Sequence, residues 1–228
     1  MKILVIGGAG FIGSNLCERL SGNHEVFSLD NYSSGSESNH VNGVFYVKGH
    51  TNKIAELIDF EIDLIFHLGE YSRVEQSFDN IQKVIESNIC GTSAVLEFWR
   101  KINCKLVYAG SSTKFSDEGA GKNQSPYAYS KGSNTELVKN YGNWFDLPYA
   151  ITYIYNVYGR REIQEGSYAT LIALFKRKYI DKKALTVVEP GSQRRNFTHI
   201  DDILDALILI GDHGQGDESV SYTHLTLP

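Results

Sequence analysis

Cysteine is scarce in this sequence of 228 residues, which contains only Cys17, Cys90 and Cys104. Each of the three stands in an apolar setting, and an odd number of thiols does not suit a framework of disulfides. We therefore expect reduced, buried thiols and a cytoplasmic protein. None of the seven histidines has a cysteine or histidine partner at metal-ligand spacing, so we expect no metal site.

Basic excess and long apolar runs are also missing. The formal net charge is -5, which leaves no surplus of Lys and Arg to neutralise phosphates and argues against a nucleic-acid partner. No run approaches the ~20 apolar residues that span a membrane, and the apolar start at 2–7 is too short for a signal sequence. The chain is 42% hydrophobic and 21% charged, which is enough apolar mass for a sizeable core.

Strand-like apolar runs alternate with helix-length segments over the first two-thirds of the chain. The hydrophobicity of each run is continuous rather than alternating, which is typical of strands buried on both faces. This rhythm predicts an α/β fold with a doubly wound parallel sheet. The predicted strands are 2–7, 24–30, 43–49, 63–69, 104–110 and 149–159.

The rhythm changes after about residue 160. Residues 166–180 have the period of an amphipathic helix, and residues 184–204 indicate a strand, a turn and the start of another helix,. We therefore divide the chain into a first domain, 1–160, and the incomplete start of a smaller domain, 161–220.

A glycine-rich turn follows the first predicted strand and opens a helix. Gly7, Gly10 and Gly13 in "GGAGFIG" allow a tight turn, so that the helix N-terminus can face a pyrophosphate,. Asp30 ends the second predicted strand, where a carboxylate accepts hydrogen bonds from an adenosine ribose and repels a 2′-phosphate,. Together they predict a site for NAD rather than NADP.

Tyr127 and Lys131 stand four residues apart in "YAYSK". On a helix such residues share one face, so the ammonium can lie beside the phenol. A cation close to a phenol favours the phenolate, which would make Tyr127 a usable base near neutral pH. Tyr129 has no lysine at the same spacing and is expected to face elsewhere.

The order of the motifs resembles that of a known family. "GGAGFIG", "DNYSSG", "FHLGEYSRVEQS", "NICGT", "VYAGSS", "SPYAYSK", "YNVYGRR" and "QRRNFTHIDD" occur as they do in the extended short-chain dehydrogenase/reductase superfamily. Within it the sequence is similar to the NAD-dependent epimerase/dehydratase family, and most of all to its UDP-glucose 4-epimerase branch. The resemblance implies a Rossmann domain, followed by a substrate-binding domain that is incomplete here.

The resemblance also implies a role for each matching residue. The pyrophosphate of NAD would lie on Gly7, Gly10, Phe11, Ile12 and Gly13, its adenosine ribose on Asp30 and Asn31, and its nicotinamide side near Asn88. Tyr127 would be the base, and Lys131 would hold the nicotinamide ribose. The substrate would contact the hydroxyls of Ser111 and Thr113 at the sugar, and Asn156 and Arg195 at the diphosphate.

The implied reaction is C4 epimerisation of a UDP-hexose, either UDP-glucose and UDP-galactose or their N-acetyl forms, through a 4-keto intermediate. Dehydratases and decarboxylases of the family need a further carboxylate just after the strand-end hydroxyl, where this chain has Ser112 and Thr113. Glu70 or Glu75 could replace that carboxylate, so a nucleotide-sugar 4,6-dehydratase or decarboxylase stays an alternative. A non-catalytic NAD-binding protein is the other alternative.

Several positions depart from the family pattern. His50 stands where an aspartate commonly contacts adenine, and Glu70 stands in "HLGE" where "HLAA" is usual. Residues 221–228 have no place in the fold, so we expect a truncated chain whose native sequence ends near Val220. Related enzymes form homodimers through two helices, here expected to lie within 81–100 and 127–143.

Overall fold

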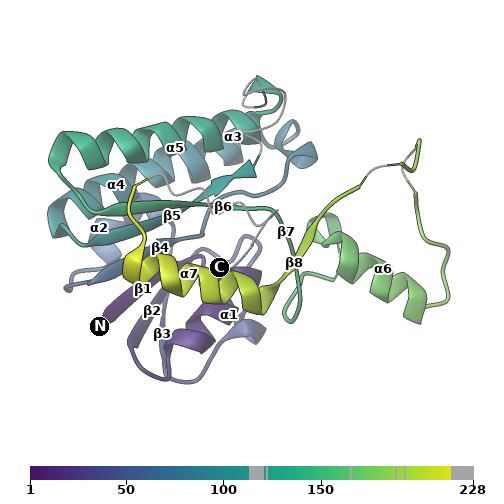
Figure 1. The fold of residues 1–228 in the computed structure, drawn as a ribbon, viewed down its shortest axis with the longest axis horizontal. Helices are drawn as coiled ribbons and strands as arrows, with labels where there is room; N and C mark the ends of the chain where they lie inside the picture. The colour runs from purple at the N-terminus through teal and green to yellow at the C-terminus, as the bar shows by residue number, and fades with distance from the viewer. Residues whose placement is uncertain (113–120, 122, 165, 188, 193, 217–228) are drawn as a thin grey trace, which may run out of the picture.

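A parallel sheet of six strands forms the centre of the molecule (Figure 1). The computed structural model describes residues 1–112, 121, 123–164, 166–187, 189–192 and 194–216. The order of the strands is β3-β2-β1-β4-β5-β6, and all five pairings are parallel. This confirms the doubly wound α/β sheet. The strands are β1 (Lys2–Ile6), β2 (Glu25–Asp30), β3 (Val44–Lys48), β4 (Leu64–His67), β5 (Lys105–Ser111) and β6 (Tyr149–Ile154).

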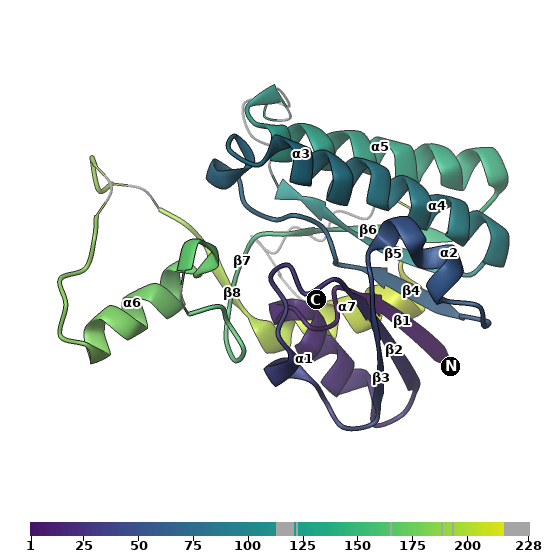
Figure 2. The same cartoon turned by 180° about the vertical axis from the view of Figure 1, so that it is seen from behind.

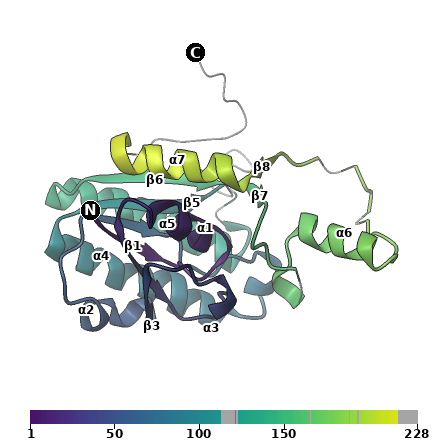
Figure 3. The same ribbon diagram turned by 90° about the horizontal axis from the view of Figure 1, so that it is seen from below.

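Helices cover both faces of this sheet (Figures 2 and 3). Successive strand residues point to opposite faces, so β1 supplies Leu4 and Ile6 to one core and Ile3 and Val5 to the other. The first core lies under α2 (Ile54–Leu57), α4 (Gly91–Ile102) and α5 (Pro126–Phe145), and the second under α1 (Phe11–Leu20) and α7 (Ile200–His213). Further helical segments in the described parts of the chain are α3 (Ile81–Val84), a π-helical stretch (Ile85–Cys90) and short 3-10 helices at Glu37–Asn39, Thr51–Lys53, Glu75–Ser77 and Gly166–Tyr168.

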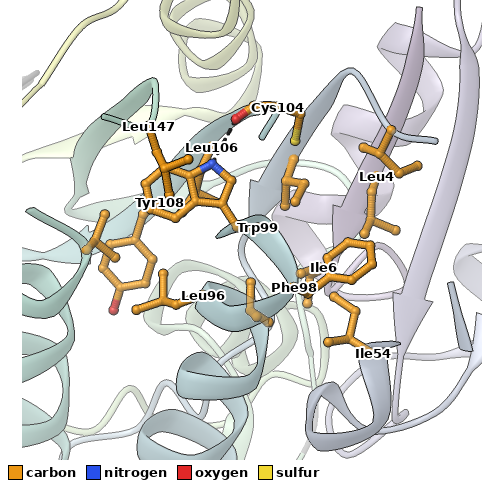
Figure 4. Close-up of a cluster of buried hydrophobic side chains, with 14 of the residues drawn as sticks. Leu4, Ile6, Ile54, Leu96, Phe98, Trp99, Cys104, Leu106, Tyr108 and Leu147 are labelled. Carbon is orange, nitrogen blue, oxygen red and sulfur yellow. Dashed lines mark hydrogen bonds between the residues drawn. The ribbon is translucent and has the colours of Figure 1, made fainter. Parts of the chain in front are cut away.

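Trp99 occupies the centre of the first core (Figure 4). Its side chain is fully buried, and its indole N–H donates a 2.8 Å hydrogen bond to the carbonyl of Cys104. This bond joins the end of α4 to the start of β5, because Cys104 directly precedes the strand.

Trp99→Phe is expected to lower the free energy of unfolding by about 1–3 kcal/mol, because the buried carbonyl of Cys104 loses its donor,. Trp144→Phe is the matched control: Trp144 is 62% exposed, so the same change there should stay within about 0.5 kcal/mol. Urea unfolding followed by circular dichroism measures both. Equal stabilities for the two variants would contradict this account of the core.

The segment between β6 and α7 lies beside the main body (Figures 1 and 3). It contains β7 (Asn156–Tyr158), α6 (Leu171–Ile180) and β8 (Phe197–His199), and β7 and β8 form a separate parallel pair. The expected single strand 149–159 was therefore wrong, because the chain leaves the large sheet at Tyr155 and pairs elsewhere.

Two further expectations need correction. Residues 184–187 do not form the predicted strand: Leu185 and Val187 are 51% and 71% exposed, with no neighbouring strand to pair with among the described residues. Cys90 is exposed, whereas Cys17 and Cys104 are buried as expected. Cys90 lies on the outer side of the π-helical turn, where an apolar sequence context does not ensure burial.

The packing of α7 does not follow the predicted division of the chain at residue 160. Ile200, Ile203, Leu204, Leu207 and Ile210 of α7 pack on the large sheet, in the core shared with α1. Only the segment from 161 to 199 therefore stays a proposed start of a second domain.

Thr113 and residues 217–228, with the expected tail, lie outside the described residues. Among the helices that are described, none is long and apolar enough to cross a membrane.

Candidate functional site

A cavity of about 540 Å³ lies at the carboxyl ends of the strands. The residues at or just after the ends of β1, β2, β4, β5 and β6 line it. The order of the strands reverses between β1 and β4, and ligands of doubly wound sheets bind at such a reversal. The sheet therefore positions this cavity, and the loops after the strands supply its chemistry.

The glycine loop forms one wall of the cavity. Gly7 has a φ of 86°, a conformation that favours glycine,. A Cβ on Gly13 would lie 2.1 Å from the carbonyl oxygen of Gly7, so a side chain at either residue would disturb the turn. Helix α1 begins after Gly10 with no side-chain cap and no acidic residue in its first turn. Its first N–H groups are thus free to bind an anion, and the loop fits a pyrophosphate.

Asp30 holds the loop at its other side. One carboxylate oxygen accepts from the N–H of Ala9 at 2.9 Å, and the other accepts from the N–H of Tyr32 at 2.8 Å. Asp30 lines the cavity, as does the neighbouring Asn31, whose side chain accepts from the N–H of Ser33 at 3.0 Å. Each carboxylate oxygen has a second lone pair, so Asp30 retains acceptor capacity for a ribose diol.

Tyr127 and Ser111 meet at the end of β5. The hydroxyl of Tyr127 donates to Oγ of Ser111 at 3.3 Å, and Ser111 is 6% exposed. Helix α5 carries Tyr127 in its first turn, where Ser125 caps the helix by accepting from the N–H of Ala128. Tyr129 is 58% exposed and points away, as the sequence predicts.

Lys131 lies deeper on the same face of α5. Its ammonium donates to the carboxylate of Glu70 and to the carbonyl of Ala109, and it lies 4.6 Å from the ring centroid of Tyr108. Both charged side chains are buried: 6% of Lys131 and 4% of Glu70 is exposed. Tyr127, Lys131 and Glu70 all line the cavity.

Glu70 is held in its ionised form by its neighbours. Burial by itself would raise the pKa of this carboxyl, but the Lys131 ammonium and the hydrogen bonds from Lys131 and Thr92 lower that pKa below its ordinary value,. The nearby His67 ring is buried, which lowers its pKa to about 4, so the ring is neutral at physiological pH.

Residues of the side segment also line the cavity. Among them are Asn156 of β7 and Arg195 just before β8, and both are exposed. The guanidinium of Arg195 donates within its own segment, to the carbonyl of Arg194. The structure thus brings the expected diphosphate contacts to the same cavity as Tyr127 and Lys131.

Neither Asn88 nor His50 is among the residues that line the cavity. Asn88 is fully buried and is not among the residues that line the cavity. Its side chain bonds the N–H and the carbonyl of Tyr71 and the hydroxyl of Ser130, so it supports the cavity wall from behind. The ring of His50 accepts from the N–H of Asn52 and caps a 3-10 helix.

Sequence reasoning missed several residues of the site. Arg73 lines the cavity and donates to the carbonyl of Tyr168, across the gap between the main body and the side segment. Asn134 donates to Glu70 from one turn beyond Lys131. Its spacing of three from Lys131 on a predicted helix was the available signal. Arg73 left no such signal, because its partner is a distant backbone atom.

Known proteins share this sequence pattern and this fold. The family model for the NAD-dependent epimerase/dehydratase family matches residues 3–222. The chain belongs to this family. NAD is accordingly its cofactor, and the cradle formed by Gly7, Gly13 and Asp30 fits that cofactor. Among the described residues, no group of three or more His, Cys, Asp or Glu side chains could hold a metal ion.

Individual family members differ in the reaction that their names state. A dTDP-D-glucose 4,6-dehydratase of Dictyostelium discoideum is 31% identical, in an alignment that covers 94% of this chain and 56% of that protein. A UDP-glucose 4-epimerase of Mycolicibacterium smegmatis is 29% identical, in an alignment that covers 96% of this chain and 75% of that protein. UDP-glucuronic acid decarboxylase 3 of Arabidopsis thaliana is also 29% identical, over 91% of this chain and 65% of that protein.

A solved structure supports the fold and the cofactor. UDP-glucose 4-epimerase from Thermus thermophilus, in complex with NAD, superposes with a TM-score of 0.84 at 26% identity, over 96% of this chain and 77% of the other. This chain is therefore shorter than its relatives.

Proposed function

We propose that this chain carries the cofactor-binding and proton-transfer part of an NAD-dependent nucleotide-sugar epimerase that acts at C4 of a UDP-hexose. The observation that carries the proposal is the contact of Tyr127 with Ser111, since Tyr127 and Lys131 line the same cavity as the glycine loop. UDP-glucose, UDP-galactose and their N-acetyl forms are the proposed substrates.

In this proposal each residue handles a proton or a charge. When bound, NAD would supply a reversible hydride acceptor for C4 of the sugar, and the glycine loop with Asp30 would hold it. The Tyr127 phenolate takes the proton of the 4-hydroxyl and later gives it back. Ser111 accepts from Tyr127, and in this proposal the Ser111 hydroxyl also bonds the reacting sugar oxygen. Asn156 and Arg195 bind the diphosphate, for which a guanidinium is well suited,.

The carboxylates of the cavity favour epimerisation over dehydration or decarboxylation. Asp30 and Glu70 are the acidic residues among the described ones that line it. Asp30 lies at the glycine loop, and Glu70 accepts from four donors, so neither offers a free acid to the sugar. Glu75 is exposed and lies outside the cavity lining. The described hydroxyls at the end of β5 and just after it, those of Ser111 and Ser112, cannot act as a carboxylate.

The complete gene product, incubated with NAD and UDP-galactose or UDP-N-acetylgalactosamine, is expected to interconvert the C4 epimers. Anomeric proton NMR signals distinguish the two sugars. A 4-keto-6-deoxy product in place of the epimer would instead support the dehydratase. Bound NAD with no conversion of any nucleotide sugar would support the non-catalytic alternative.

We also propose a cytoplasmic homodimer. Large apolar side chains stay exposed on the expected interface helices, with Ile81 and Ile85 at 48% and 49%. A dimer that packs these helices against a second copy would bury that surface.

A further inference from the structure

The carboxylate of Glu70 accepts hydrogen bonds from four side chains that come from three elements. Its Oε1 accepts from Thr92 at 2.6 Å and from Asn134 at 2.7 Å, while Tyr108 reaches both oxygens, at 3.2 and 3.0 Å. Its Oε2 accepts from the ammonium of Lys131. Since a carboxylate offers about four lone-pair sites, these donors fix both its position and its rotation.

The network behind Glu70 has a defined direction. Nε2 of His67 lies 3.0 Å from Oγ1 of Thr92. The single hydroxyl proton of Thr92 goes to Glu70, so Thr92 must accept from His67, and the neutral ring then carries its proton on Nε2. The other ring nitrogen, Nδ1, is buried with no hydrogen-bond partner, which suits an unprotonated nitrogen. His67, Thr92 and Glu70 are thus linked by two hydrogen bonds, and each donor points toward the carboxylate.

These hydrogen bonds lead to Lys131, the cation that the resemblance to the family assigns to the cofactor. In the described part of the structure, Glu70 and the carbonyl of Ala109 accept two of the three ammonium protons of Lys131. The third ammonium proton has no hydrogen-bond acceptor among the described residues, and Lys131 lines the cavity. Because the pair is almost fully buried, solvent screens its charges far less than those of a surface pair.

We propose that Glu70 is a positioning residue that fixes Lys131 and cancels its charge. The cavity then binds the oxidised, positively charged nicotinamide more favourably, relative to the reduced, neutral one, than it would with Lys131 unpaired. The proposal rests on the placement of Lys131 at the cofactor. An unpaired ammonium there would repel the positive ring and favour its reduced, neutral form. With Glu70 present, the buried pair is neutral. The resemblance to the family implies no acid at this position, so we expect this balance to be a feature of the present protein.

Glu70→Gln tests the proposal without any sugar. The variant keeps the size of the side chain but leaves Lys131 without its counter-charge. Equilibrated with a soluble redox couple of fixed ratio, it is expected to raise the ratio of bound NADH to bound NAD about tenfold, which corresponds to about 30 mV for two electrons. Reduced-nicotinamide absorbance of the bound fraction measures the ratio. Glu56→Gln removes the same charge from an exposed site on α2 and should leave the ratio unchanged.

Two further variants separate positioning from a direct role. Lys131→Met leaves the Glu70 carboxylate unpaired, so it should lower the NADH ratio, opposite to Glu70→Gln. The double variant is neutral again and should return to within about twofold of the unaltered protein, since paired residues couple strongly. A double variant as perturbed as Glu70→Gln alone would show that Glu70 acts independently of Lys131, and would overturn the proposal.

Breaking a buried pair is strongly destabilising, so Glu70→Gln could prevent the protein from folding. In that case Lys131→Met and the double variant still decide, since equal ratios for these two would sink the proposal. No sugar enters the measurement, so a failed epimerase assay leaves this test unaffected, and the converse also holds.

Discussion

Tyr127→Phe is expected to lower the rate of sugar conversion by about 10²–10⁴-fold, the usual contribution of a positioned acid or base. The change removes one oxygen, the atom that donates to Ser111. The glycine loop and Asp30 are untouched, so the affinity for NAD should stay within about twofold of its starting value. Steady-state kinetics and calorimetric titration of NAD measure the two quantities separately.

Tyr129→Phe is the matched control for this prediction. Tyr129 lies two residues further along α5 and is 58% exposed, so the loss of its hydroxyl should change neither rate nor affinity. If Tyr127→Phe retained the full rate, the assignment of the base would be wrong. If it lost NAD together with the rate, Tyr127 would act in binding the cofactor instead.

Gly13→Ala is expected to cost the protein both stability and affinity for NAD. The added Cβ would lie 2.1 Å from the carbonyl oxygen of Gly7 and 2.9 Å from Cα of Gly8. Both are backbone atoms, so the turn itself must move. Such overpacking costs about 1–3 kcal/mol. If that strain falls on the N–H groups that bind the pyrophosphate, it lowers the affinity roughly 10- to 100-fold.

Gly22→Ala provides the comparison, because a Cβ on Gly22 meets no atom within 4 Å. Its melting temperature and NAD affinity should match those of the unaltered protein. Thermal unfolding and NAD titration of the two variants then isolate the effect of the close approach. Unchanged NAD affinity in Gly13→Ala would mean that this loop does not form the pyrophosphate site.

The fold could be predicted from sequence because its signals are local. A strand buried on both faces has a continuous apolar run, and five of the six predicted strands match observed ones to within two residues at each end. The glycine loop and the Tyr127–Lys131 spacing are also local, since one turn or one helix fixes them. The side segment was predicted less well, because β7 and β8 pair across about 40 intervening residues. The stretch at 184–187 was predicted as a strand from its apolar residues, but no local pattern in the sequence indicates that these residues stay exposed.

The sequence alone determined the parallel sheet, the NAD loop and the tyrosine–lysine pair, because short segments encode them through periodicity and spacing. Only the tertiary structure decided what surrounds them. It showed that Asn88 supports the wall behind Tyr71, and that Glu70 lies against Lys131 rather than free at the sugar. The donors that fix Glu70 lie 22 to 64 positions away along the chain. The physical reason is that a buried charge needs partners in space, and packing selects those partners with no regard to their distance in sequence.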